Sequence, residues 1–260
     1  YPTINKSATD SVHSDFHTMY PNQGYWVYSN GNSTLSIQTR HTYQASVEWV
    51  GLYHGYAPDL PWSQTVAKNF KNELMTDSNW NIPSSKFLGD NTIPIPIASH
   101  WTTSSDTRYV DSSDLAFFEG HGSQNGLIFG DNSVASWSSP IKWGDTIGSR
   151  QLAWVAIDGC SVLQRPNTNW YQTFKGIHGI VGWQTDAYVD TNWGYYFAHR
   201  MLQGKSVWEA WKYAYDQTPV SRGSHHSQLA VLYAQSSDGS CLNDRLYGHG
   251  YWVTLGDHNT

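Results

Sequence analysis

Three apolar segments of the chain each end in residues whose side chains can take part in catalysis. They are SSDLAFFEGHGS (112–123), QLAWVAIDGCS (151–161) and GIHGIVGWQTDA (176–187). In an open parallel sheet, ligands bind outside the carboxyl ends of the strands. A thiol and an imidazole at neighbouring strand ends can form a thiolate–imidazolium pair, the form in which cysteine is a strong nucleophile. The spacing therefore predicts that Cys160 and His121 meet in one crevice.

Glycines flank both of these residues. Gly122 follows His121, and Gly159 precedes Cys160. A glycine lets the backbone come close to a bound carbonyl group, and backbone N–H groups can stabilise the oxyanion that forms there. We expect the N–H groups of Gly122 and Cys160 to form this oxyanion hole.

The elements that must position these residues can be read from the hydrophobic pattern. Strands that are apolar throughout, separated by helix-length segments, predict a mostly parallel sheet covered on both faces. Apolar residues at four-residue spacing predict a helix over 62–75. The segment 192–217 predicts two helices interrupted at Gly204, and 45–56 predicts a strand. The helix after Gly204 should bury one face, made of Val207, Trp208, Trp211 and Ala214.

The composition narrows the function classes. The 260 residues carry a net charge of −6, without clustered cations, which argues against a nucleic acid as partner. No apolar run reaches the ~18–20 residues that a membrane-spanning helix needs. The few lysines and the sequons at Asn5 and Asn32 favour a secreted protein. The first 45 residues read as β-rich, with a hairpin signal at Asn30-Gly31.

Two of these motifs resemble those of a known clan. AFFEGHGSQ (116–124) resembles the strand and His-Gly segment of metacaspases, and WVAIDGCS (154–161) resembles the Asp-x-Cys segment of caspase-like peptidases. The segment 193–214 is similar to the helix pair that follows these motifs in the gingipain-like branch. The resemblance implies a caspase-like three-layer α/β/α sandwich. We expect residues 1–260 to form one catalytic domain, with its core at 110–215 and a β-rich addition at 1–45.

The resemblance also implies roles for residues. His121 would be the general base, Cys160 the nucleophile that forms a thioester, and Gly122 part of the oxyanion hole. Asp158 stands where metacaspases have an acidic residue that selects Arg or Lys, and Asp186 resembles a second such residue. Glu119 departs from the pattern, because metacaspases usually have a small residue there; it is a candidate substrate-binding residue that could orient His121 or simply be a polar strand end. The chain is thus expected to be a cysteine endopeptidase that acts on a peptide or protein, with a basic residue preferred before the cleaved bond.

Other interpretations of these residues stay open. Cys160 could instead form a disulfide with Cys241. A metal site could be formed by His225-His226 or by the Gly-His-Gly run at 248–250. However, the sequence has neither the HExxH spacing nor a Cys/His quartet that zinc sites use, so no metal or cofactor is expected. Calcium held by acidic loops, with the ligands Asp131, Asp186 and Asp190, is left open. The 14 tryptophans suggest a carbohydrate-binding or glycan-processing module, and a non-catalytic caspase-like scaffold is a third alternative.

Overall fold

The computed structural model describes residues 42–102, 105–139, 141–145, 152–165, 169–187, 190–218, 227–236 and 239–246. The predicted hairpin at Asn30-Gly31, nearly all of the predicted β-rich addition, and both sequons lie outside these residues. So do His225-His226 and the run at 248–250.

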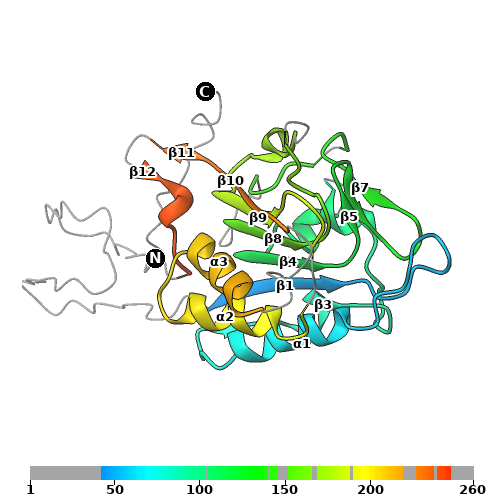
Figure 1. The fold of residues 1–260 in the computed structure, drawn as a ribbon, viewed down its shortest axis with the longest axis horizontal. Coiled ribbons are helices and arrows are strands. Elements are labelled where there is room, and N and C mark those ends of the chain that lie inside the picture. The colour runs from blue at the N-terminus through cyan, green and yellow to red at the C-terminus, as the bar shows by residue number, and fades with distance from the viewer. Residues whose placement is uncertain are drawn as a thin grey trace, which may run out of the picture. The chain divides into compact units, whose positions relative to one another are not determined.

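A seven-stranded sheet forms the centre of the fold (Figure 1). Its order is β10-β9-β8-β4-β1-β2, and β3 also pairs with β1. The pairs β1–β3, β1–β4, β4–β8 and β8–β9 are parallel, and β10 runs antiparallel to β9. The prediction of a mostly parallel sheet is therefore confirmed. The strands are β1 (Tyr43–Trp49), β2 (Trp80–Asn81), β3 (Phe87–Leu88), β4 (Leu115–Glu119), β8 (Trp154–Asp158), β9 (Gly179–Trp183) and β10 (Leu229–Tyr233).

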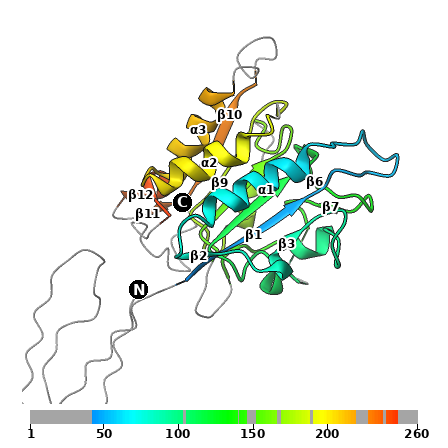
Figure 2. The same ribbon diagram turned by 90° about the horizontal axis from the view of Figure 1, so that it is seen from below.

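The α-helices of the described residues cover one face of this sheet (Figure 2). They are α1 (Ser63–Leu74), α2 (Trp193–Leu202) and α3 (Val207–Gln217). The Phe70 and Phe197 rings stack on Phe117 of β4, with centroids 4.5 and 6.4 Å from it. A capping box between Ser206 and Glu209 starts α3, which explains why the helix pair is interrupted just before it.

Short 3₁₀ turns and loops, rich in tryptophan, pack on the opposite face. Trp101, Trp143 and Trp170 are fully buried there, and the last two stack with centroids 5.3 Å apart. The described residues are thus mixed α/β, and α-helices lie on one face of the sheet instead of both. The 3₁₀ helices of the described residues are η1 (Ser84–Lys86), η2 (Ala98–Trp101), η3 (Asp106–Arg108), η4 (Trp170–Thr173) and η6 (Cys241–Asn243).

Two small antiparallel sheets complete the description. One contains β5 (Gly122–Ser123), β6 (Gly126–Ile128) and β7 (Val134–Ala135). The other pairs β11 (Gln235–Ser236) with β12 (Gly239–Ser240). Within the described ranges, no helix is both long enough and apolar enough to cross a membrane.

The predicted elements exist, with shorter strands than the hydrophobic pattern suggests. The strand predicted at 45–56 ends at Trp49, because the chain turns at Gly51 to meet Leu60. The helix predicted at 62–75 is α1, and Gly204, with φ of +79°, separates α2 from α3. On α3, Val207, Trp211 and Ala214 are buried together with Ala210, and Trp208 is half-buried.

Candidate active site at the carboxyl ends of the parallel strands

The three predicted strand ends lie side by side in the sheet. β4 pairs in register with β8, with Glu119 opposite Asp158, and β8 pairs with β9. The pairing continues past the strands, since Ser161 N–H donates to the Thr185 carbonyl at 2.8 Å. His121 and Cys160 therefore follow adjacent parallel strands at the same edge of the sheet.

His121 is held on both sides by the loop that follows β1. Its backbone N–H donates to Tyr53 Oη at 2.7 Å, and the two rings lie with centroids 4.6 Å apart. Its Nε2 lies 2.7 Å from the Pro58 carbonyl oxygen. A carbonyl oxygen only accepts hydrogen bonds, so Nε2 must carry the proton in this contact. In the neutral ring, Nδ1 is then the nitrogen with a lone pair that can accept a proton.

The loop that presents Tyr53 and Pro58 is folded by its own hydrogen bonds. Tyr53 N–H donates to Asp59 Oδ1 at 2.9 Å, and Leu60 N–H donates to the Gly51 carbonyl at 2.7 Å. Tyr53 is fully buried, and burial raises the pKa of its phenol. Sequence reasoning missed Tyr53 and Pro58. Neither residue belongs to a catalytic motif. The available hint in the sequence was their position, since Tyr53 lies near the end of the strand predicted at 45–56 and Pro58 lies just after it.

The Cys160 thiol is half-buried beside the segment that follows β9. Its Sγ accepts a hydrogen bond from the Ala187 N–H at 3.3 Å. Burial raises the pKa of Cys160, the carboxylates of Asp186 and Asp158 raise it further, and the Ala187 N–H opposes them. The raised pKa favours the thiol over the thiolate in this resting structure, whereas the sequence suggested that a thiolate–imidazolium pair can form. Cys160 and Cys241 are not bonded to each other, so the disulfide alternative is wrong for this structure.

The glycines beside His121 and Cys160 pack the two turns against each other. A Cβ on Gly122 would lie 2.5 Å from Val162 Cγ1, and one on Gly159 would lie 3.1 Å from the Gly120 carbonyl. Ile128 N–H donates to the His121 carbonyl, so Gly122 and Leu127 form a non-hydrogen-bonded pair of the small sheet. The N–H of Gly122 therefore points away from that sheet. Gly122 meets this requirement for the predicted oxyanion hole.

Glu119 and Asp158 point to the helix-covered face of the sheet. Both are buried: Ser63 Oγ of α1 donates to Glu119 Oε1 at 3.2 Å, and Trp183 Nε1 donates to Asp158 Oδ1 at 2.7 Å. Burial raises the pKa of Asp158 to about 6 and that of Glu119 well above its usual value. The proximity of the two carboxyl groups also contributes to the raised pKa of Glu119. Neither offers a surface to a substrate in this structure.

Asp186 has the accessibility that those two carboxylates lack. It is exposed, and it is close enough to Cys160 for its charge to affect the pKa of the thiol. Asp131 and Asp190 each accept a hydrogen bond from the backbone N–H two residues ahead, at 2.9 and 2.7 Å. With Asp186 they do not gather into a three-residue metal cluster among the described residues, so the calcium alternative gains no support.

A small hollow of about 90 Å³ lies at the end of β1. Aliphatic side chains (Leu52 and Ile95) and carboxylates (Asp90 and Asp131) line it. Burial raises the pKa of Asp90. Neither His121 nor Cys160 lines this hollow, so it is a neighbour of the candidate active site rather than part of it.

The chain belongs to the family DUF6345, which is described as a domain of unknown function and whose model matches residues 47–256. The matched range includes every candidate site residue named so far except Asn5 and Asn32 of the sequons. A search of curated proteins finds no match.

Proposed function

We propose that this protein is a caspase-like cysteine hydrolase that cleaves a peptide or related amide bond. The observation that carries the proposal is the contact between His121 Nε2 and the Pro58 carbonyl at 2.7 Å. It leaves Nδ1 as the base on a strand end adjacent to that of Cys160. A nucleophile, a base and a group that orients the base are the parts that nucleophilic catalysis requires.

The reaction follows from these parts. As Cys160 Sγ attacks the substrate carbonyl carbon, its proton passes to His121 Nδ1. The oxyanion accepts hydrogen bonds from the N–H groups of Gly122 and Cys160. His121 then donates the proton to the amine as the C–N bond breaks, which leaves a thioester on Cys160. Water attacks the thioester, giving a proton to His121, and this proton returns to the departing Sγ.

The preference for a basic substrate residue now depends on Asp186. An exposed carboxylate near the nucleophile can pair with a guanidinium or ammonium group. Asp158 is 1% exposed and already hydrogen-bonded, so we assign it to support of the sheet rather than to the substrate pocket.

Cleavage of a fluorogenic peptide set, with Arg, Lys, Asn and Asp before the scissile bond, tests the proposal. We expect Cys160→Ala and His121→Ala each to lower kcat/KM by about 10³-fold or more. His199→Gln is the matched control, because His199 pairs with Glu73 far along the chain from the motifs. Mass spectrometry with a peptidyl acyloxymethyl ketone should find the adduct on Cys160. Cleavage that persists in both variants would refute the dyad.

The glycan alternative loses its main support in the structure. Aromatic platforms must be exposed, yet most tryptophans of the described residues lie in the core, with Trp62 an exposed exception. The fully buried ones are Trp49, Trp101, Trp143, Trp170, Trp183, Trp193 and Trp211. The scaffold alternative would be favoured if the native chain neither cleaved the peptide set nor reacted with the ketone.

A further inference from the structure

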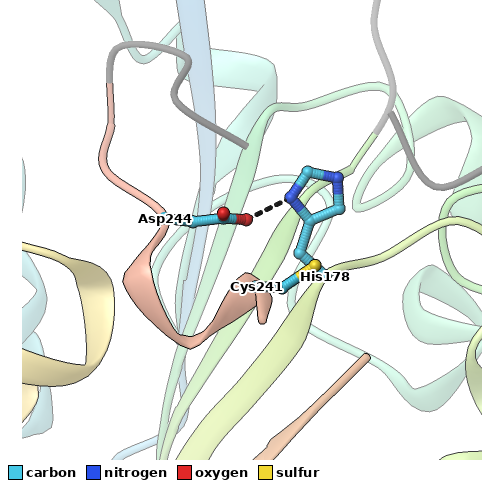
Figure 3. Close-up of side chains that lie close together, drawn as sticks. All are labelled: His178, Cys241 and Asp244. Atoms are coloured by element: carbon cyan, nitrogen blue, oxygen red, sulfur yellow. Dashed lines mark hydrogen bonds and ion pairs between the residues drawn. The ribbon is translucent and has the colours of Figure 1, made fainter. Parts of the chain in front are cut away.

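A second group of reactive side chains gathers at the opposite end of β9 from the candidate active site. His178 directly precedes β9, Cys241 begins η6, and Asp244 follows η6 (Figure 3). One ligand atom from each residue, nitrogen, sulfur and oxygen, lies within 4.8 Å of the others. We propose that His178, Cys241 and Asp244 bind a zinc ion that fastens the segment after β10 to the sheet.

The chemistry of the three groups suits zinc. Zn²⁺ takes imidazole nitrogen, thiolate sulfur and carboxylate oxygen in tetrahedral geometry, with bonds of about 2.0–2.3 Å. Such bonds place the ligand atoms roughly 3.3–3.8 Å from one another. The observed grouping needs only small side-chain movements to reach that geometry. A water molecule would complete the four ligands.

The backbone holds the three ligands in place before any ion arrives. His178 N–H donates to the Ala153 carbonyl at 2.6 Å, and the His178 carbonyl accepts from Ala234 N–H at 2.8 Å. The Asp244 carbonyl accepts from the Val207 N–H at the start of α3, at 2.9 Å. A site prepared in this way loses little conformational entropy when the ion binds.

Contacts of the Asp244 carboxylate favour a metal site as well. Its Oδ2 is hydrogen-bonded to His178 Nδ1 and also accepts from Trp154 Nε1 at 3.3 Å. Such outer contacts orient ligating carboxylates in metal sites. On zinc binding, the ion replaces the hydrogen bond between His178 and Asp244: the proton on His178 Nδ1 moves to Nε2 through solvent, and the thiol proton of Cys241 is released to solvent.

A second thiol catalytic centre is the competing interpretation of a Cys, His and Asp group. Cys241 is 2% exposed and Asp244 is 4% exposed. A nucleophile must reach its substrate, whereas a structural metal ligand need not. Burial therefore favours the metal site.

Cobalt titration of the Cys160→Ser chain is the decisive experiment, because Cys241 is then the remaining thiol of the two in the sequence. We expect one Co²⁺ per chain, with a sulfur-to-cobalt charge-transfer band that Zn²⁺ abolishes. Zn²⁺ at about 100 times its Kd should also raise Tm by about 5 °C or more. A spectrum without the charge-transfer band would overturn the proposal, and this readout does not depend on a variant of the site itself.

Variants of the ligands provide the second arm. His178→Gln and Cys241→Ala should each weaken zinc binding at least about a hundredfold, as measured by calorimetry. The control is His199→Gln, which alters another histidine–carboxylate pair, His199 with Glu73, and should leave zinc affinity unchanged. Zinc binding that is equal in all three variants would place the ion elsewhere and refute the site. The outcome is independent of the proposed hydrolase activity.

Discussion

At the scale of single residues, the orientation of His121 depends on two groups outside its own motif. Tyr53 Oη accepts its backbone N–H, and the Pro58 carbonyl accepts its ring N–H. Gly120 makes this arrangement possible, because a Cβ there would lie 2.7 Å from Tyr53 Oη. His121, the proposed base, is thus positioned by packing between two loops, so changes at Tyr53 should affect the proposed catalysis without touching the reacting atoms.

Tyr53→Phe tests this positioning. It removes the acceptor of a part-buried N–H group, which costs about 1–3 kcal/mol of unfolding free energy. We also expect kcat/KM for a peptide substrate to fall several-fold, through kcat more than KM, while the pH profile keeps its shape. Urea unfolding and peptide cleavage measure the two effects. Tyr56→Phe is the control, since Tyr56 is 61% exposed. Equal effects in both variants would contradict a positioning role for Tyr53.

The charge of Asp186 should suppress the reactivity of Cys160. A raised pKa leaves less thiolate at a given pH, so alkylation of native Cys160 by iodoacetamide should keep increasing from pH 7 to pH 9. Removing the charge with Asp186→Asn lowers the pKa, and we expect alkylation at pH 8 to accelerate about twofold, a size typical of exposed charges.

Peptide mapping by mass spectrometry follows the modification at Cys160. Asp190→Asn is the control from the same loop, as Asp190 accepts a local backbone N–H and is not among the groups that raise the thiol pKa. An alkylation rate that is already constant from pH 6 would instead indicate a thiolate–imidazolium pair.

At the scale of elements, β4 and β8 are joined by a buried acid pair as well as by their backbone hydrogen bonds. Glu119 and Asp158 stand opposite each other at the last residue of each strand. Burial raises the pKa values of both groups, Ser63 of α1 donates to Glu119, and Trp183 donates to Asp158. The pair therefore links the two strand ends that carry His121 and Cys160 to the helix-covered face.

The acid pair should make stability depend on pH. Because both folded pKa values are raised, the folded chain holds protons that the unfolded chain has lost. The stabilisation is full below the unfolded pKa values near pH 4 and decreases as pH rises, first through about pH 6 for Asp158. Glu119→Gln keeps a side chain of similar size without an ionisable proton. We expect its Tm advantage over the native chain to grow from pH 6 to pH 9.

Expressed as free energy of unfolding, the difference between the variant and the native chain grows by at most about 1.4 kcal/mol per pH unit for one proton. Thermal unfolding followed by circular dichroism measures it. Glu209→Gln is the control, because the Ser206 N–H lowers the pKa of Glu209 and the group stays ionised throughout that range. A constant Tm difference between Glu119→Gln and the native chain across pH 6–9 would show that the pKa of Glu119 is not raised.

At the scale of the whole molecule, the sequence predicted the elements that repeat a simple pattern. The parallel strand ends and the helix pair around Gly204 follow from apolar runs and four-residue spacing. The loops on the second face carry no such period, so no pattern in the sequence indicates them. We expected a helical layer there, whereas loops with buried tryptophans pack on that face. The assignment of Asp158 failed for a different reason. Because Asp158 lies two residues after Ala156 in β8, the two side chains point to the same face of the sheet. The sequence does not reveal that helices cover this face; the structure does.

The zinc ligands illustrate the same limit of sequence reasoning. Cys241 and Asp244 lie three residues apart, but His178 lies 66 residues before Asp244, so no local spacing joins it to them. Their grouping depends on how β10 and the segment after it return to the amino end of β9. Long-range returns of this kind have no local signal in the sequence.

The in-register pairing of β4 with β8 has a consequence for how the family can diversify. The proposed nucleophile and base directly follow strands of the buried sheet, whereas Asp186 and the hollow at the end of β1 belong to loops. Insertions and substitutions accumulate more easily in loops than in a packed core. Substrate choice can therefore evolve while the reacting pair stays fixed. Transplanting loops between family members should transfer specificity without rebuilding the catalyst.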